Sequence, residues 1–349
     1  MSIPFDPSQS IVDLTAELAT DSNRSPAKLR SVACLGGLCI ERDVSTDELH
    51  EYIADEANVV WLDVQDPGEA ELEILLDQFG FHPLSVEDVV HPDQRPKIDE
   101  YKGYLFVVAH SVLNFDDLYD VELFEVDMFV GRNYLVTVHR GPAPPLEVAF
   151  SRWTSGGELM KEGLGFLVYT VLDSLVDAFF PVLDAVEEHM EDAEIDLFSG
   201  DSMEQVPQLL RLKRTLMRLR RIVAPLREVF SSFLRREQSL FGPQTRIYLH
   251  DVYDHVLRIL DGLEMEREML SGAVEANLSV LSNRLNATMK TLTVITIVVA
   301  MMGAVFGAWG MNFDVIPLQE HPEGFWILFI GTMSAVAASL AWAWRRRWL

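Results

Sequence analysis

The pattern of hydrophobic and polar positions divides the chain into an N-terminal mixed region, a helical middle and an apolar end. Up to about residue 155, short apolar runs rich in Val, Phe and Tyr alternate with amphipathic stretches, which is typical of strands and helices. The expected strands are SVACLGGLCI, NVVWLDV, YLFVVAHSVL, ELFEVDMFV and NYLVTVHR, and a helix is expected at ELEILLDQFG. We therefore predict an α/β domain over residues 28–155, after an N-terminal lead of residues 1–27.

The middle of the chain has the spacing of long helices. One helix is expected from about Glu158 to Phe198, with acidic later turns, and another from about Met203 to Glu237, which is rich in Arg. The basic stripe of the second helix indicates either a nucleic-acid surface or a partner for the acidic helix before it. The adjacent opposite charge and the interleaved leucines favour the second interpretation, an antiparallel helical hairpin over residues 156–240.

A third helical pattern begins near Gln244 and meets no proline or clear stop through Trp309. At ~1.5 Å per residue, a helix over residues 244–309 would be about 100 Å long. From Leu263 to Leu292 its apolar residues recur at three-, four- and seven-residue spacing. This spacing resembles a coiled-coil seam, so we expect a stalk helix that associates with further copies of the chain.

Two uncharged segments near the C-terminus are long enough to cross a bilayer as helices. Thr291–Phe313 has 23 residues and Phe325–Trp344 has 20, and about 20 apolar residues suffice. We therefore predict two transmembrane helices, at about residues 291–309 and 325–344, in a multi-pass protein of the cell (inner) membrane.

The orientation of these helices follows from the bases that flank them. Lys290 precedes the first segment, and Arg345–Arg347 lie in the basic tail of residues 345–349. The positive-inside rule then places both termini in the cytoplasm and the loop of residues 310–324 outside. The N-terminus lacks a basic start and an apolar core, so no signal peptide is expected.

Charge and motifs narrow the function. The formal net charge of the 349-residue chain is −26, and residues 291–349 hold as many acids as bases, so all of it lies in the first 290 residues. Such a region repels nucleic acid and attracts cations, although acidity could also serve solubility alone. Cys34 and Cys39 are expected to be buried, reduced thiols. The sequence contains no GxxxxGK[ST], HExxH or GxSxG motif, so we expect no enzyme.

The triplet Gly310-Met311-Asn312 lies at the outer end of the first apolar segment, and a basic C-terminus follows the second. In this place the triplet resembles the signature of the CorA family of divalent-cation channels. Supporting stretches are EDVVHPDQRPK, LKRTLMRLRRIVAPLREVFSS, HDVYDHV and NATMKTLT. The resemblance covers nearly the whole chain.

The resemblance implies a funnel-shaped homopentamer in the lipid bilayer. Each chain would have an α+β cytoplasmic domain (an α/β sandwich), a long stalk helix and two C-terminal transmembrane helices. It also implies a gated channel for passive influx of Mg²⁺, often with Co²⁺ and Ni²⁺, and no organic cofactor. Two alternatives are a Zn²⁺ transporter of the related ZntB-like branch and a membrane-tethered cation sensor that conducts nothing.

The chemistry of Mg²⁺ suits the outer loop. The ion requires octahedral oxygen coordination and gives up its water reluctantly. The amide oxygen of Asn312, and carbonyls turned inward at Gly310, could hold a hydrated ion, although Asn312 could instead only cap the helix. With Met311, these residues are the predicted selectivity site. The loop acids Asp314, Glu320 and Glu323 would concentrate cations or be ordinary solvated residues.

One face of the stalk helix is the candidate pore. The resemblance implies that this face lines the ion pathway, with an apolar gate at Met289 and Leu292, whereas plain helix packing is the alternative. Where the family commonly has Met-Pro and then Thr, this chain has AMMG, which predicts a straighter helix near Ala300. The face consists of Asn286, Met289, Leu292 or Thr293, Thr296, Ala300, Gly303 and Gly307.

Three cytoplasmic acids match the regulatory metal ligands of the family. By resemblance, Asp251 in HDVYDHV is a ligand, Asp88 in EDVV is its partner on the neighbouring subunit, and Asp173 in VLDSLVD lies nearby. Mg²⁺ bound between subunits would favour the closed state, so that high internal Mg²⁺ shuts the pore. The alternative is that all three are ordinary solvated acids.

Overall fold

The computed structural model describes residues 26–36, 38–156, 158–199, 205–235, 242–311 and 321–346. The chain divides into two compact units. The first unit comprises Met1–Ile195 and Pro207–Ser271, and the second comprises Asp196–Val206 and Gly272–Leu349.

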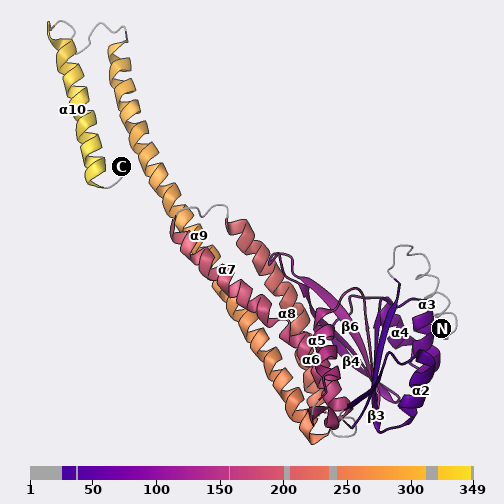
Figure 1. The fold of residues 1–349 in the computed structure, drawn as a ribbon. Coiled ribbons are helices and arrows are strands. Elements are labelled where there is room, and N and C mark those ends of the chain that lie inside the picture. Colours follow the sequence, from indigo (N-terminus) through magenta and orange to yellow (C-terminus); the bar gives the residue numbers. More distant parts are fainter. Residues whose placement is uncertain are drawn as a thin grey trace, which may run out of the picture. The chain divides into compact units, whose positions relative to one another are not determined.

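A seven-stranded sheet with the order β2-β1-β3-β7-β6-β5-β4 forms the centre of the first unit (Figure 1). Neighbouring strands are antiparallel except for β3 and β7, which run parallel. The strands are β1 (Lys28–Leu35), β2 (Leu38–Arg42), β3 (Asn58–Gln65), β4 (Lys97–Tyr101), β5 (Tyr104–Asn114), β6 (Glu122–Val130) and β7 (Tyr134–His139).

The predicted single strand over SVACLGGLCI is wrong. The chain turns back at Gly36, and β1 and β2 form an antiparallel hairpin in which Cys34 lies opposite Cys39. Gly36 has φ +56°, a left-handed conformation that glycine adopts without steric cost. Neither cysteine forms a disulfide, and Cys34 is buried, as predicted. Cys39 is only partly buried, so the prediction of two buried thiols holds for one of them.

Helices cover both faces of the sheet and make a three-layer α/β sandwich (Figure 1). Over one face, the core includes the fully buried side chains of Leu62, Phe106 and Phe129. The other face buries Trp61 of β3 against Phe150 of α5, and α6 packs on β5 and β7. The helices of the first face are α2 (Thr46–Ala54), α3 (Glu69–Glu73), the π-helix η1 (Ile74–Gln78) and α4 (Pro83–Val90), and those of the second are α5 (Pro144–Thr154) and α6 (Leu164–Asp177).

The helix predicted from Glu158 to Phe198 is broken in the structure. It consists of the 3₁₀-helix η2 (Glu158–Glu162), then α6, then α7 (Phe180–Ser199). Pro181 lies in the first turn of α7, where its missing N–H costs no helical hydrogen bond, so the break at Ala178 and Phe179 places the proline where a helix accepts it most readily.

Among the described residues, three helical segments are long and apolar enough to cross a membrane. The first, Leu164–Asp192, is a core element instead, since 61% of its most apolar window is buried inside the protein. The other two lie in α9 (Pro243–Trp309) and α10 (Gly324–Arg345), and only 6% and 11% of their windows are buried. Their apolar side chains therefore face outward, as a lipid environment requires.

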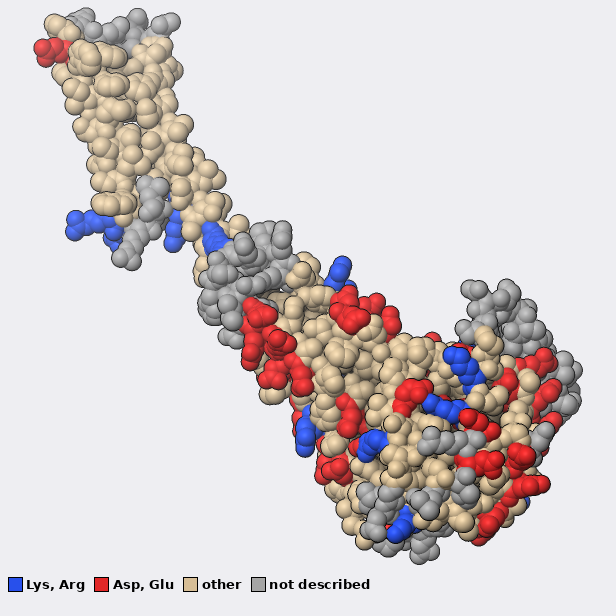
Figure 2. All heavy atoms as spheres, in the orientation of Figure 1, with Lys and Arg blue, Asp and Glu red and all other residues tan. Residues whose placement is uncertain are grey.

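Charged side chains follow the same division. In the view of Figure 2, acidic residues are spread over the first unit, whereas α9 after Lys290 and α10 before Arg345 carry no charged side chain. No ion pair joins a described side chain of the basic helix α8 (Gln205–Arg235) to the acidic helix before it. Its cations reach elsewhere, with Arg220 lying 3.4 Å from Glu264 of α9 and Arg218 lying 3.3 Å from Asp120.

Candidate functional site

Helix α10 covers one side of α9 and leaves the predicted pore face bare. The partly or fully buried positions of α9 in this region include Val294, Val298 and Val305. At about 100° per residue, their side lies about 180° around the helix from the predicted pore face. All of the predicted pore positions are exposed, namely Asn286, Met289, Leu292, Thr293, Thr296, Ala300, Gly303 and Gly307.

The bare face alternates a few polar groups with apolar and small residues. The hydroxyl of Thr296 donates to the carbonyl of Leu292 at 2.8 Å, and that of Thr293 donates to Met289 at 2.7 Å. Their oxygen lone pairs remain available to a cation or its water. The helix continues without interruption through Ala300 and Gly303, where the chain lacks proline. A single such face encloses no pathway, so conduction requires several copies around an axis.

The outer end of α9 closes with ordinary helical hydrogen bonds. The N–H of Gly310 donates to the carbonyl of Phe306 at 3.0 Å, and that of Met311 donates to Ala308 at 3.4 Å. Gly310 is not among the glycines with positive φ, and a Cβ there would be in van der Waals contact with the carbonyl oxygen of Phe306, at 3.4 Å. Gly310 therefore does not use the left-handed conformation that favours glycine, and the inward turn of its carbonyl stays a prediction.

The remaining predicted residues of the outer loop are only partly placed. Asn312, Asp314 and Glu320 lie outside the described residues. Glu323 directly precedes α10, where its side chain makes no capping hydrogen bond and its N–H donates to the His321 ring at 3.3 Å.

The first unit gathers acids around one histidine at the contact of α6 with α9. Nδ1 of His255 lies 3.0 Å from Asp177 and 3.9 Å from Asp173, and one ligand atom from each residue lies within 4.8 Å of the others. Asp173 is buried and also accepts a hydrogen bond from Arg152 at 2.8 Å. Asp251, one turn before His255, is exposed, and its carboxylate lies 3.9 Å from Nε2.

The electrostatics of this cluster favour a cation. Burial and the nearby charge of Asp173 raise the pKa of Asp177, although His255 opposes the shift. Burial lowers the pKa of Arg152, but Asp173 outweighs it, so the guanidinium stays charged. Two carboxylates and an imidazole can hold a divalent cation. The nitrogen donor suits Co²⁺, Ni²⁺ or Zn²⁺ directly, whereas Mg²⁺ prefers oxygen ligands and keeps its water.

Asp88 is placed differently from the other two predicted regulatory acids. It lies on α4, where Nζ of Lys97 approaches its carboxylate at 2.7 Å. No described contact within the chain joins Asp88 to Asp173 or Asp251, whereas those two meet around His255. An intersubunit partnership of Asp88 with Asp251 therefore stays a prediction.

The sequence reasoning missed His255, Asp177 and Lys97. A usable signal existed for the first two, because Asp251 with His255 and Asp173 with Asp177 are each four residues apart and so share a helix face. That the two pairs face one another depends on how α6 packs against α9, which the spacing alone does not reveal.

Comparison with known proteins gives a consistent result. A family model described as "CorA-like Mg2+ transporter protein" matches residues 56–346. The chain is 32% identical to YfjQ of Bacillus subtilis over 82% of this chain and 89% of that protein. It is 30% identical to the cobalt/magnesium transport protein CorA of Thermotoga maritima over 78% of each chain.

The fold agrees with a solved full-length structure. The CorA magnesium transporter from Methanocaldococcus jannaschii matches with a TM-score of 0.77 at 22% identity, covering 91% of this chain and 98% of that chain. The chain belongs to the CorA-like Mg²⁺ transporter family.

Proposed function

We propose that this chain forms a Mg²⁺ channel, which also passes Co²⁺ and Ni²⁺, through which the ion flows passively into the cell. The observation that carries this proposal is the bare face of α9, which holds every predicted pore position and lies opposite α10. Apolar and small residues with a few polar groups, left uncovered along a membrane helix, suit packing around a common axis. Membership of the family supports Mg²⁺ as the cargo.

The channel is a homopentamer in which both termini of each chain are cytoplasmic and α9 and α10 cross the membrane. Glu323 and the other outer-loop acids raise the local cation concentration. A ring of five Asn312 amides with Gly310 and Met311 then holds the hydrated ion without removing its water. Further in, rings of Met289 and Leu292 close the pathway by excluding water.

Internal Mg²⁺ closes this channel by binding between subunits. Asp251 and Asp173, which meet around His255, offer one half of the site. Asp88 of the neighbouring chain supplies the other half. Because each neighbouring cytoplasmic unit is acidic, a bound divalent cation stabilises their contact and shifts the population toward the closed state.

The test is ion flux into liposomes that contain the purified chain and an internal Mg²⁺ dye. Mg²⁺ flux that is lost in Asn312→Ala but kept in His321→Ala, an exposed control in the same loop, would support the proposal. Flux of Zn²⁺ but not of Mg²⁺ would instead identify a ZntB-like transporter. No flux of either ion would indicate a non-conducting sensor.

The number of subunits needs its own measurement. Native mass spectrometry of the chain in detergent should give the mass of five copies. A different closed ring would refute the pentamer without refuting conduction, since any number of copies that encloses the bare face of α9 could form a pathway.

A further inference from the structure

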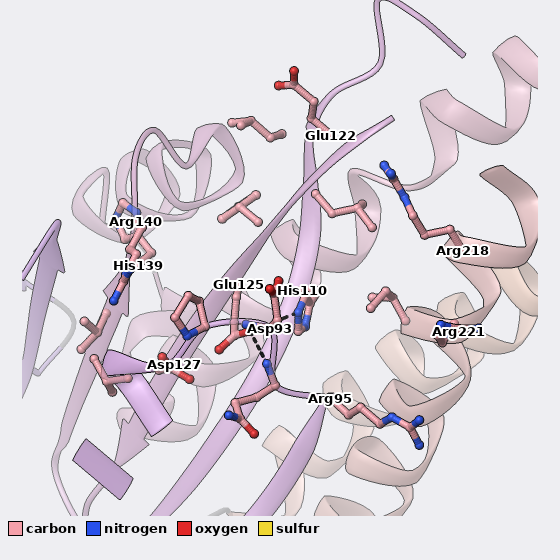
Figure 3. Close-up of a pocket in the computed structure, with 18 of the residues that line it drawn as sticks. Asp93, Arg95, His110, Glu122, Glu125, Asp127, His139, Arg140, Arg218 and Arg221 are labelled. Carbon is pink, nitrogen blue, oxygen red and sulfur yellow. Dashed lines mark hydrogen bonds and ion pairs between the residues drawn. The ribbon is translucent and has the colours of Figure 1, made fainter. Parts of the chain in front are cut away.

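A cavity of about 750 Å³ lies in the first unit, and its lining includes neither a predicted pore residue nor a member of the cluster around His255. Strands β5 and β6 form its floor, the segment between α4 and β4 forms one wall, and α8 forms the opposite wall (Figure 3). Its volume lies within the range of about 300–1,000 Å³ that is usual for small-molecule sites.

The floor holds three buried polar side chains with unused hydrogen-bonding atoms. His110 and Glu125 are cross-strand neighbours, and Asp127 lies two residues further along β6 on the same face. The side chains of His110 and Glu125 are 8% and 10% exposed, and Asp127 is 5% exposed. Among the described residues, nothing bonds to Nδ1 of His110, Oε1 of Glu125 or Oδ1 of Asp127.

Part of this floor is already fixed in position. The other oxygen of Glu125, Oε2, accepts hydrogen bonds from the backbone N–H groups of Asp93 at 2.8 Å and Gln94 at 2.9 Å. The same oxygen lies 3.3 Å from Nε2 of His110. The unused atoms therefore belong to a preorganised surface. Buried polar atoms of this kind are rare in folded proteins unless something binds them.

The rim opposite the floor is basic, although the chain as a whole is strongly acidic. Arg95 comes from the segment before β4, and Arg218 and Arg221 come from α8 (Figure 3). Arg218 lies 3.3 Å from Asp120, whereas Arg95 and Arg221 form no ion pair with any residue that the structure describes. Guanidinium groups recognise phosphate and carboxylate through paired hydrogen bonds.

The two sides of the cavity require different groups on one ligand. A bare metal ion does not fit, because the only described set of three or more His, Cys, Asp and Glu side chains whose ligand atoms converge within 4.8 Å is that of Asp173, Asp177 and His255. A simple anion would meet the arginines and leave the carboxylates of the floor unused. Between floor and rim, the walls are apolar and include Val89, Leu113, Leu123, Phe124, Val138 and Ile222.

We propose that this cavity binds a phosphorylated nucleoside. Its phosphate lies at Arg95 and Arg221, and its base lies between the apolar walls with its amino group against Asp127 and Glu125. The base supplies the hydrogen-bond partners that the carboxyl groups of the floor lack, and its flat apolar faces suit the aliphatic walls. A sugar phosphate without a base would meet only the rim.

Isothermal titration calorimetry on the full chain in lipid nanodiscs tests this proposal. The probes are adenosine diphosphate, ribose 5-phosphate and inorganic phosphate, each in the presence of a chelator, and Mg²⁺ alone. We expect saturable binding of adenosine diphosphate and binding of the other two phosphates at least tenfold weaker. Asp127→Asn should weaken adenosine diphosphate about tenfold and leave ribose 5-phosphate unchanged, because the amide keeps only one of the two carboxyl oxygens as an acceptor.

Arg221 of the rim provides a second test that does not depend on Asp127. Arg221→Gln should weaken adenosine diphosphate and ribose 5-phosphate alike, by about tenfold. Arg214→Gln, at an exposed position of the same helix that does not line the cavity, should change neither. Circular dichroism checks that each variant is folded.

Several results would overturn the proposal. These are no saturable binding of adenosine diphosphate to the unmodified chain, equal affinity for ribose 5-phosphate, and binding that Arg221→Gln leaves unchanged. Heat from Mg²⁺ alone that Asp127→Asn abolishes, without any from the nucleotide, would assign the floor to a cation instead. None of these readouts depends on ion flux, so the proposed channel stands or falls separately.

Discussion

Asp63 on β3 is a buried carboxylate that other elements keep ionised. Thr137 donates to it at 2.5 Å, Arg30 donates at 2.9 Å, and the ring of His139 lies 3.6 Å away. Burial raises the pKa of Asp63, but His139, Thr137 and Arg30 together outweigh burial and lower the pKa below its usual value. The network ties β1, β3 and β7 together on the face that α5 covers.

This network predicts a pH dependence of stability. Because the folded pKa of Asp63 is below the unfolded value of about 3.9, its contribution is fully present above that value and is lost as pH falls through the folded pKa. Asp63→Asn should therefore lower the free energy of unfolding by about 2 kcal/mol at pH 7. It should also weaken the fall of that free energy as the pH drops below 7, the acid limb of the stability curve. Urea unfolding between pH 3 and 7 measures both, with the exposed Asp116→Asn as control. An acid limb as steep as that of the unmodified chain would contradict the assignment.

Lys97 holds the proposed regulatory ligand Asp88 within its own chain. Burial lowers the pKa of Lys97, but Asp88 and Asp99 outweigh it and raise the pKa, so the ammonium stays charged. It lies 2.7 Å from Asp88 and 3.2 Å from Asp99. A metal ion that binds Asp88 must therefore compete with this cation.

Removing that competitor should sensitise the channel to internal Mg²⁺. A partly exposed ion pair is worth up to about 1 kcal/mol, so Lys97→Met should lower the half-inhibiting internal Mg²⁺ concentration about fivefold. Flux into liposomes preloaded with graded Mg²⁺ measures it, and the exposed Lys102→Met is the control. Inhibition at unchanged or higher Mg²⁺ would show that Asp88 does not bind the ion.

Among the elements, the contact of α6 with the start of α9 is unusually close. A Cβ at Gly165 would lie 2.4 Å from Oγ1 of Thr245 and 2.7 Å from its Cγ2. Thr245 is fully buried, and its hydroxyl has no partner among the described residues. The same two helices carry Asp173 and His255, so this contact sets the register of the cluster.

Overpacking this contact should destabilise the first unit. Gly165→Ala is expected to cost about 1–3 kcal/mol, because either the helices or Thr245 must move. Adding Thr245→Ala removes the two clashing atoms, so the double variant should recover part of the loss. Urea unfolding of the two single variants and the double variant, followed by circular dichroism, gives the double-mutant cycle. Gly272→Ala, a helical glycine with open space around it, should be neutral or stabilising by about 1 kcal/mol. Strictly additive effects at residues 165 and 245 would rule out the steric explanation.

At the scale of the whole molecule, the proposed channel requires copies of α9 to meet through its bare face. Leu292 lies on that face, exposed in the single chain. Leu292→Gly should open the proposed apolar gate and raise Mg²⁺ flux at high internal Mg²⁺ at least severalfold. Ile295→Gly carries a similar helix cost of about 1 kcal/mol at a position outside the predicted pore face, so it separates gating from helix stability. Equal flux in the two variants would place the gate elsewhere.

The elements most readily predicted are those whose local signals agree with their surroundings. The strands β5 and β7 have continuous apolar runs because helices cover both faces of the sheet. Helix α9 has a long helical periodicity of apolar residues and no proline after its first residue. The predictions of secondary structure were wrong where one residue or a short polar segment determined where an element begins or ends. Gly36 turns one apolar run into two strands, Pro181 divides an apolar helix, and the polar sequence of β4, KIDEY, carries no strand periodicity.

The sequence by itself determined the acidic first 290 residues, the two uncharged segments and the face of α9 that carries the predicted pore positions. Composition and periodicity are local properties of the chain, so they can be read from the amino-acid sequence alone. Only the tertiary structure decided that His255 joins Asp173 and Asp251, that Lys97 occupies Asp88, and that His110, Glu125 and Asp127 share a cavity floor with arginines opposite. These groups are distant in sequence, and only the packing of helices on the sheet brings them together.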